Sequence, residues 1–284
     1  MSMRVIRTIS GLREALLPAR RSGNSIGFVP TMGALHAGHS FLIRTARQEC
    51  GILVVSIFVN PTQFDEKDDY ARYPRPLEAD AALCETLGVD MVFAPDEREM
   101  YPEPQLTVVE VGKVSDDLCG RFRPGHFRGV ATVVLKLLNI VQPGRAYFGE
   151  KDAQQLVVIR RMVADLNLLA EIVAVPTVRE PDGLALSSRN RRLSGEERGV
   201  ALSLYRALRT AEQCIREGVT DPEAVKQAGL AVLEQQPGVQ VEYLEIVDCE
   251  EMQPVASISG PVRVAGAIRV GSTRLIDNLT VELS

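Results

Sequence analysis

The residues with the clearest chemistry are two histidines three positions apart. His36 and His39 lie in the segment 30–39, which also contains Gly33 and Gly38. Imidazole nitrogens donate hydrogen bonds to phosphate oxygens, and glycines allow a ligand to approach the backbone closely. This pattern predicts a binding site for the phosphates of a nucleotide.

The flanking elements place this segment where a strand leads into a helix. The apolar run 26–29 favours a β-strand, and an amphipathic stretch begins near Ser40. A helix start exposes unpaired N–H groups and carries the positive end of the helix dipole, so it binds anions well. The position of the histidines therefore supports a phosphate site.

Two further segments carry groups suited to phosphates. Residues 186–189 read Leu-Ser-Ser-Arg, and the two hydroxyls and the guanidinium suit the β- and γ-phosphates of a nucleotide. In residues 149–152, Lys151 is placed to reach an α-phosphate, while Asp152 is placed to fix Lys151 or to contribute to Mg²⁺ binding. For each segment taken alone, an ordinary solvated loop or turn is the alternative.

A basic island and two glutamines complete the candidates. The island has no acidic residue within it and consists of Arg121, Arg123, His126 and Arg128. Its Arg-Pro-Gly-His turn favours a second anion-facing loop, with a solvated surface loop as the alternative. Gln63 and Gln155 are neutral amides that both donate and accept, which suits a small substrate with hydroxyls and a carboxylate. Met32 is placed to cover an apolar part of that substrate, although methionine more commonly packs in a core.

Length and composition exclude several classes of protein. The 284 residues suffice for one large or two ordinary domains, and 45% hydrophobic with 24% charged residues is typical of a soluble globular protein. A formal charge of −5 argues against a general nucleic-acid or membrane-surface binder. The longest apolar runs, 52–59 and 130–141, are too short or too interrupted to span a bilayer. The five scattered cysteines have neither zinc nor redox spacing, so we expect a reduced, cytoplasmic setting without a secretory signal.

The order of apolar runs and helical patterns predicts the fold. Strand-like runs recur at 26–29, 52–59, 89–94 and 172–178, and helical patterns lie at 12–21, 41–50, 77–87, 130–141 and 156–166. Buried strands that alternate with helices predict an α/β fold with a Rossmann-like, doubly wound parallel sheet. Ligands of such sheets lie beyond the carboxyl ends of the strands. Segments 30–39, 60–63 and 149–152 all follow strand-like runs and are expected to meet there.

The pattern changes after about Ser188. Ser194 as N-cap and Glu197 at the capping-box position predict a long helix to about Glu217, followed by a second helix from Asp221 to Gln235. Strands are expected at 239–247, 262–270 and 274–283. The sequence therefore predicts a larger Rossmann-like domain over residues 1–186 and a smaller α+β, lid-like domain over residues 187–284.

Longer blocks of sequence carry a family resemblance. They are PTMGALHAGH at 30–39, VSIFVNPTQF at 55–64, RPGHFRGV at 123–130, FGEKDAQQL at 148–156, DGLALSSRN at 182–190 and TRLIDN at 273–278. With these blocks in this order, the chain resembles the pantothenate synthetase (pantoate–β-alanine ligase) family along almost its entire length. The His-Ala-Gly-His element is also similar to that of the HxGH nucleotidyltransferases, which include class I aminoacyl-tRNA synthetases. Residues 186–189 correspond to the mobile phosphate-binding loop of that superfamily.

The resemblance implies an ATP-dependent ligase with two chemical steps. In the first, the carboxylate of (R)-pantoate attacks the α-phosphorus of ATP and gives pantoyl adenylate and pyrophosphate. In the second, the amine of β-alanine attacks the acyl carbon and gives pantothenate and AMP. The resemblance further implies Mg²⁺ with ATP and a homodimer through the larger domain, and it implies small-molecule substrates rather than nucleic-acid or membrane partners.

The same resemblance implies a role for individual residues. His39 would be the proton donor, with His36 and Lys151 as further catalytic groups. Gln63 would contact pantoate and then β-alanine, and Gln155 would contact pantoate. The ATP site would comprise Met32, Gly33, Ala34, Leu35, His36, Ala37, Gly38, His39, Gly149, Glu150, Lys151, Asp152, Val178, Leu186, Ser187, Ser188 and Arg189. No metal ligand is implied, and the loop 116–122 is left without a role.

Two other functions share parts of this pattern. A related nucleotidyltransferase acting on another acid or phosphate ester would keep the histidine segment and differ around Gln63 and Gln155. A catalytically idle nucleotide sensor would keep the fold alone, and the intact Lys151, histidines and glutamines argue against it. Measurement of pyrophosphate release with a panel of acids would distinguish the related nucleotidyltransferase from a pantoate ligase. ATP binding without pantoate-dependent turnover would favour the nucleotide sensor.

Overall fold

The computed structural model describes residues 2–65 and 67–283. The chain forms two compact units, each assembled from separate segments. One unit comprises Met1–Val111, Arg123–Glu150 and Val158–Pro176, and the other comprises Gly112–Phe122, Lys151–Val157 and Thr177–Ser284. A domain boundary after residue 186 stays a prediction.

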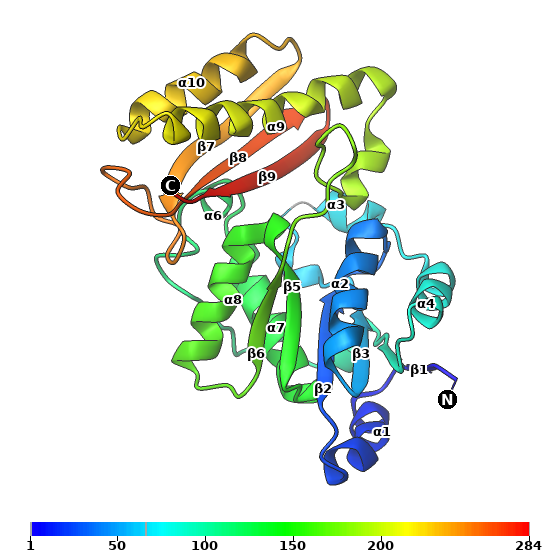
Figure 1. Cartoon of the computed structure of the whole chain (residues 1–284). Coiled ribbons are helices and arrows are strands. Elements are labelled where there is room, and N and C mark those ends of the chain that lie inside the picture. The colour runs from blue at the N-terminus through cyan, green and yellow to red at the C-terminus, as the bar shows by residue number, and fades with distance from the viewer. Residues whose placement is uncertain (1, 66, 284) are drawn as a thin grey trace. The chain divides into compact units, whose positions relative to one another are not determined.

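The first unit is built on a six-stranded sheet in which every neighbouring pair is parallel (Figure 1). The strand order is β1-β4-β3-β2-β5-β6. The strands are β1 (Arg4–Ile6), β2 (Ile26–Thr31), β3 (Ile52–Ile57), β4 (Met91–Phe93), β5 (Arg145–Gly149) and β6 (Glu171–Val175). The helices are α1 (Ile9–Arg21), α2 (Ala37–Glu49), α3 (Lys67–Arg72), α4 (Leu77–Thr86), α5 (Glu97–Met100), α7 (His126–Val141) and most of α8 (Ala153–Asp165). This confirms the predicted doubly wound, Rossmann-like sheet.

Both faces of this sheet are covered, which explains the continuous apolar runs in the sequence. Val29, Val55 and Tyr147 join Ile43 of α2 and Cys84 of α4 in one core cluster. The alternate strand positions are buried as well, and α1 packs against α7. Strands with two buried faces lose the polar–apolar alternation of half-exposed strands.

The strand order reverses between β2 and β5. These neighbours pair with Gly27 opposite Arg145, while the next strands in sequence, β3 and β6, lie on opposite sides of the pair. In open α/β sheets, ligands bind beyond the carboxyl ends of the strands at such a reversal. The segments that follow Thr31 and Gly149 start at this position, as predicted from the sequence.

The second unit contains a three-stranded antiparallel sheet in the order β7-β8-β9. Its elements are β7 (Val239–Asp248), β8 (Val262–Val270), β9 (Thr273–Val281), α6 (Cys119–Phe122), α9 (Gly195–Arg216) and α10 (Pro222–Glu234). The predicted capping box starts α9: Ser194 Oγ accepts from the Glu197 N–H at 3.1 Å, and the Glu197 carboxylate accepts from the Ser194 N–H at 2.8 Å. Leu208 and Val264 join the helices to the sheet in a second core cluster. The predicted α+β fold is confirmed.

The structure adds elements for which the sequence pattern gave no range. Strand β5 reads Arg-Ala-Tyr-Phe-Gly without a β-branched residue, and β1 has three residues. Short helical turns also occur at η1 (Pro61–Gln63), η2 (Glu150–Asp152) and η3 (Ser188–Arg192). Among the described residues, no helix is both long enough and apolar enough to cross a membrane.

Candidate active site

The loop between β2 and α2 has a backbone conformation that most residues avoid. Gly33 and Ala34 have φ angles of 78° and 52°. Thr31 Oγ1 accepts from the Gly33 N–H at 3.1 Å and donates to the Ser56 carbonyl at 2.7 Å. A Cβ on Gly33 would lie 2.9 Å from Asp80 Oδ2. Position 33 therefore requires glycine for its conformation and for its space.

A buried carboxylate fastens this loop to α4. Asp80 is 3% exposed, and its two oxygens accept from the Ala34 and Leu35 N–H groups at 2.8 Å each. Hydrogen bonds to an ionised acceptor are about twice as strong as neutral ones. Asp80 therefore fixes the backbone immediately before His36. Asp80 was not predicted as a positioning residue, because an acidic residue in the first turns of an amphipathic helix is usually solvent-exposed.

The two histidines form the cap of α2. His36 Nδ1 accepts from the Gly38 N–H at 3.2 Å, and His39 Nδ1 accepts from the His36 N–H at 3.4 Å. Their ring centroids are 4.1 Å apart, with the planes inclined at 49°. Because each Nδ1 is an acceptor, a neutral ring carries its proton on Nε2. The start of α2 therefore combines two imidazole N–H donors with the positive end of the helix dipole.

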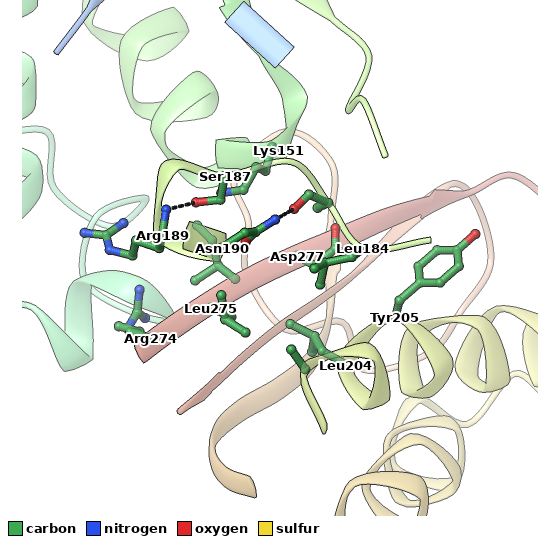
Figure 2. A pocket seen from close by; sticks show the side chains of 13 residues that line it. Lys151, Leu184, Ser187, Arg189, Asn190, Leu204, Tyr205, Arg274, Leu275 and Asp277 are labelled. Atoms are coloured by element: carbon green, nitrogen blue, oxygen red, sulfur yellow. Dashed lines mark hydrogen bonds between the residues drawn. The ribbon is translucent and has the colours of Figure 1, made fainter. Parts of the chain in front are cut away.

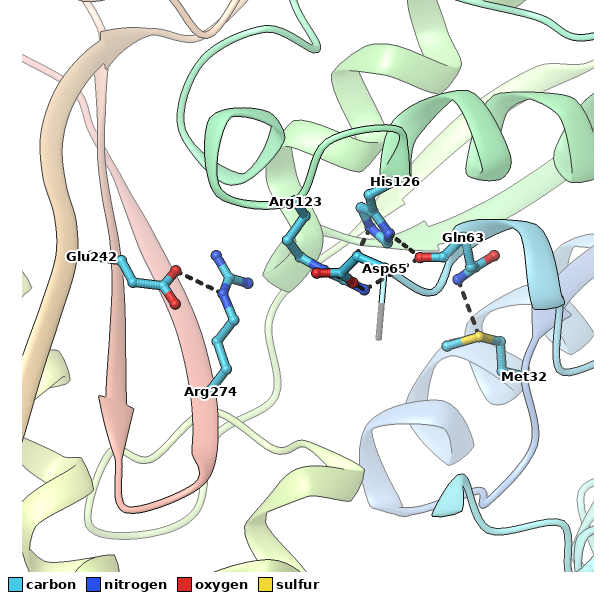
Figure 3. Close-up of polar contacts among 7 residues, drawn as sticks. All are labelled: Met32, Gln63, Asp65, Arg123, His126, Glu242 and Arg274. Carbon is cyan, nitrogen blue, oxygen red and sulfur yellow. Dashed lines mark hydrogen bonds and ion pairs between the residues drawn. The ribbon is translucent and has the colours of Figure 1, made fainter. Parts of the chain in front are cut away.

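Gln63 lies in η1, directly after β3, and contacts the histidine loop (Figure 3). Its side chain is held by Asn60, whose Nδ2 donates to Gln63 Oε1 at 3.0 Å. Gln63 Nε2 lies 3.1 Å from the sulfur of Met32, so the structure brings these two predicted residues together. Asn60 is 1% exposed and also accepts from the Tyr101 hydroxyl at 2.8 Å. Asn60 was not predicted as a positioning residue, although this residue lies in the 55–64 block.

Two members of the basic island contact groups within the protein, and an anion-facing role for the island stays a prediction. Arg123 donates to Asp65 from Nε at 2.9 Å and from Nη2 at 2.7 Å. His126 is 8% exposed and donates from Nδ1 to the Gln63 carbonyl at 2.8 Å (Figure 3). Burial raises the pKa of Asp65, but the Arg123 guanidinium outweighs burial and holds this pKa below its usual value. Two members of the island therefore support Gln63, and their acidic partner lies far away in sequence.

In the second unit, three of the predicted ATP-binding residues line one pocket (Figure 2): Lys151, Ser187 and Arg189. Ser187 caps η3 and accepts from the Arg189 N–H at 3.2 Å. The Lys151 side chain is 18% exposed, and its Nζ lies 3.8 Å from Asp152 Oδ1. Asn190 and Arg274 also line the pocket. The rest of the lining is mainly apolar, with Leu184, Leu204 and Leu275 among it, and Asp277 contributes one carboxylate. The polar part of the lining thus includes hydroxyl, ammonium, amide and guanidinium groups, which suit an anionic ligand.

Strand β9 holds the backbone at Lys151 from within the same unit. Asn278 Nδ2 donates to the Lys151 carbonyl at 3.0 Å, and Arg263 Nη1 donates to Asn278 Oδ1 at 3.1 Å. The neighbouring Asp277 accepts from both terminal nitrogens of Arg179, at 2.6 and 2.8 Å. The 273–278 block thus has a structural role beside Lys151 that the sequence did not reveal.

The remaining predicted residues of this unit lie nearby in the chain. The Val178 carbonyl accepts from the Leu186 N–H at 2.9 Å, which brings these two residues together, and Ser188 starts η3. Gln155 is partly exposed in the first turn of α8.

Gln154, next to Gln155 in the chain, contacts the loop for which the sequence predicted no role. Gln154 is 6% exposed, and its Oε1 accepts from the Cys119 N–H at 3.0 Å. Its Nε2 donates to the carbonyls of Val114 and Asp117 at 3.0 and 2.8 Å. The segment 114–119 is therefore attached to the first turn of α8.

The candidates are distributed over both units. The first unit contains residues 32–39, Gln63, Gly149 and Glu150, and the second contains Lys151, Asp152, Gln155, Val178 and residues 186–189. Within the described part of the chain, no three or more His, Cys, Asp or Glu side chains are grouped so as to hold a metal ion.

Comparison with known proteins identifies the family. The family model described as pantoate-beta-alanine ligase matches residues 4–280. A bifunctional pantoate ligase/cytidylate kinase of Synechococcus elongatus is 56% identical over 273 residues, which are 95% of this chain and 52% of that protein. The chain thus spans about half the length of this relative. Pantothenate synthetases of Pelotomaculum thermopropionicum and Moorella thermoacetica are each 51% identical, and the matches cover 97% and 99% of this chain and 98% and 100% of theirs.

Solved structures agree with the sequence relatives. Pantothenate synthetase from Thermus thermophilus is 49% identical with a TM-score of 0.92, covering 98% of this chain and 99% of that one. Pantoate-beta-alanine ligase from Francisella tularensis, complexed with beta-gamma ATP and beta-alanine, is 36% identical with a TM-score of 0.80, covering 98% and 97%. From its sequence motifs, its fold and these matches, the chain belongs to the pantoate–β-alanine ligase family.

Proposed function

We propose that the chain condenses (R)-pantoate with β-alanine in an ATP-dependent reaction that gives pantothenate, AMP and pyrophosphate. Family membership over residues 4–280 supports this reaction, as does the complex of the 36% identical Francisella relative with beta-gamma ATP and beta-alanine. One structural observation carries the proposal. The capping box of His36 and His39 turns both Nδ1 atoms toward the backbone, so Nε2 carries the N–H donor of each neutral ring.

The proposed chemistry has two steps through pantoyl adenylate. A carboxylate oxygen of pantoate forms a bond to the α-phosphorus, and the bond from this phosphorus to pyrophosphate breaks. The amine of β-alanine then forms the amide bond, AMP leaves with the former carboxylate oxygen, and the amine releases a proton. Adenylation is needed because a free carboxylate is a poor electrophile, whereas a mixed acyl phosphate has a good leaving group.

In the first step the protein stabilises and positions charge. The amino end of α2, with His36 and His39, binds phosphate oxygens, and Lys151 neutralises charge at the α-phosphate. Ser187 and Arg189 bind the β- and γ-phosphates and the departing pyrophosphate. Mg²⁺ in such sites is usually bound by substrate phosphates and water with few protein groups. We propose that Mg²⁺ arrives with ATP in the same way.

In the second step the neutral amides orient the small substrates. Gln63 contacts pantoate and then β-alanine, and Gln155 contacts pantoate. The Asn60 bond at 3.0 Å fixes which end of the Gln63 amide accepts, so the other end donates. Met32, in contact with Gln63, covers the apolar carbons of pantoate.

An isotope experiment tests the adenylate. Pantoate labelled with ¹⁸O in its carboxylate is incubated with ATP and β-alanine, and the nucleotide product is analysed by mass spectrometry. Adenylation transfers one labelled oxygen to AMP and leaves one in pantothenate. Unlabelled AMP, or ADP with phosphate, would reject the mechanism. Pyrophosphate release with other acids but not with pantoate would point to a different nucleotidyltransferase.

We further propose that the chain acts in the cytoplasm as a homodimer through the larger domain. The cysteines, which have neither zinc nor redox spacing, support the location, and the resemblance to the family supports the dimer. Sedimentation equilibrium should give about twice the chain mass of 31.1 kDa, and a monomer at working concentration would reject the dimer. Recovery of the native protein in the membrane or secreted fraction would reject the location.

A further inference from the structure

Arg274 and Arg269 share one carboxylate in the sheet of the second unit. They pair in register on β9 and β8, and both donate to Glu242 of β7. Arg274 Nε lies 2.7 Å from Glu242 Oε2 (Figure 3). Arg269 Nε lies 3.0 Å from Oε1 of the same carboxylate. One carboxylate balances one of the two guanidinium charges. A net positive charge therefore remains on these three side chains.

The two arginines differ in where they lie. The Arg274 side chain is 14% exposed and lines the pocket that contains Lys151 and Arg189 (Figure 2). The Arg269 side chain is 37% exposed and does not line that pocket. The same ion-pair network thus supplies one cation to the predicted phosphate pocket and one to the outside of it.

The terminal nitrogen Nη2 of Arg274 is buried, and no acceptor among the described residues lies in hydrogen-bond geometry with it. The Arg274 side chain also lies near the Tyr243 hydroxyl: burial raises the pKa of Tyr243, and Arg274 opposes that rise. Native proteins keep few buried donors without an acceptor, because such donors are unfavourable. The bond from Nε to Glu242 is enough to join β9 to β7, so a purely structural arginine does not need Nη2 at this position. A guanidinium donor that lines one pocket with an ammonium and a second guanidinium suits the oxygens of a phosphate chain.

We propose that Arg274 is an anion-binding residue, and that its Nη2 donates to an oxygen of the β- or γ-phosphate of ATP and of the pyrophosphate product. This inference rests on the proposed function, because it assigns Arg274 to the same phosphate pocket. Arg274 stabilises the charge that develops on pyrophosphate as the bond to the α-phosphorus breaks. It complements Lys151, which acts at the α-phosphate.

The test measures binding of inorganic pyrophosphate to the full chain by calorimetry, without ATP or turnover. Arg274→Gln removes the charge and Nη2 but keeps an amide able to donate to Glu242. We expect its dissociation constant for pyrophosphate to rise about tenfold or more, as for the loss of one hydrogen bond between charged groups. Arg269→Gln is the matched control, because it removes the other guanidinium on Glu242, and its dissociation constant should stay within about twofold.

The outcomes separate this inference from its alternatives. Equal losses in both variants would show that Glu242 pairing acts through structure, and an unchanged Arg274→Gln would show that Nη2 binds no phosphate oxygen; either overturns the inference. Absence of pyrophosphate binding to the unaltered chain overturns it as well. If Arg274→Gln does not fold, Arg274→Lys takes its place, and unchanged affinity is again the contrary result. Since the titration needs no catalysis, failure of the isotope experiment alone would reject the proposed reaction without deciding the role of Arg274.

Discussion

Replacement of Asp80 tests whether one buried carboxylate shapes the β2–α2 loop. In Asp80→Ala, the Ala34 and Leu35 N–H groups lose acceptors at 2.8 Å. Each buried donor without an acceptor costs about 1–3 kcal/mol, so the free energy of unfolding should fall by about 2–6 kcal/mol. Asp80→Asn keeps one acceptor oxygen, and its expected loss is about 1–3 kcal/mol. Domains of ordinary stability withstand the smaller loss, so the asparagine variant suits kinetics.

The loss of stability should come with a loss of ATP use. The carboxylate fixes the backbone directly before His36, and displacement of a binding group by about 1 Å can cost about 100-fold in rate. We expect kcat/KM for ATP to fall by about 10- to 100-fold in Asp80→Asn. The KM for β-alanine should change by about twofold at most, because Gln63, the residue proposed to contact β-alanine, lies outside this loop.

Three measurements complete this test. Denaturant unfolding gives stability, steady-state kinetics gives kcat/KM, and amide hydrogen exchange of Ala34 and Leu35 reports the loop directly. Glu78→Gln is the matched control. Glu78 is exposed in the first turn of α4, and its replacement by glutamine removes the same charge from this helix. If Asp80→Asn and Glu78→Gln agree in all three measurements, the role of the carboxylate is refuted.

Four further changes have defined outcomes. His39→Ala should lower kcat by about 100-fold or more with little change in the KM for pantoate. Gln155→Ala should mainly raise the KM for pantoate. Steady-state kinetics measures both constants, and unchanged values in either variant would reject the role of that residue. Trypsin cleavage within 186–190 should slow when ATP and pantoate are bound, and equal rates would contradict a mobile phosphate-binding loop. Because the pKa of Asp65 lies below its usual 3.8, its charge stabilises the fold at neutral pH, and this stabilisation disappears as the pH falls through the folded value. Asp65→Asn should therefore cost about 0.5–1 kcal/mol in unfolding free energy at pH 7 and much less at about pH 3, and a pH-independent cost would contradict the ion pair with Arg123.

The sequence predicts most of the fold because local patterns determine it. Long apolar runs correctly indicated the strands that contain Val29 and Val55, and the capping box at Ser194 indicated the start of α9. Strand β5 lacks β-branched residues and depends on the burial of Tyr147 against α2, which is a tertiary effect. Sequence patterns that extend over a few residues do not contain this information.

The candidate site is predicted from sequence where its chemistry is contiguous. The histidine loop and the 186–189 segment carry their groups in adjacent positions. Asp80, in contrast, acts through contacts with residues distant in the chain, and Asn60 acts through a buried amide. Nothing in their local sequence distinguishes them from exposed polar residues. The contact of Arg123 with Asp65 could not be predicted from the sequence, because Asp65 comes from another segment.

The imidazole cap of α2 also limits what His39 can do as an acid. A neutral ring that accepts at Nδ1 would have to become an imidazolate to release its Nε2 proton, which is unfavourable near neutral pH. A ring protonated at both nitrogens can deliver a proton easily, but it can no longer accept the His36 N–H. So long as the cap is intact, the ring therefore acts as a polar donor, and proton delivery requires the first turn of the helix to loosen. His39 therefore cannot act as a strong acid while it caps the first turn of α2.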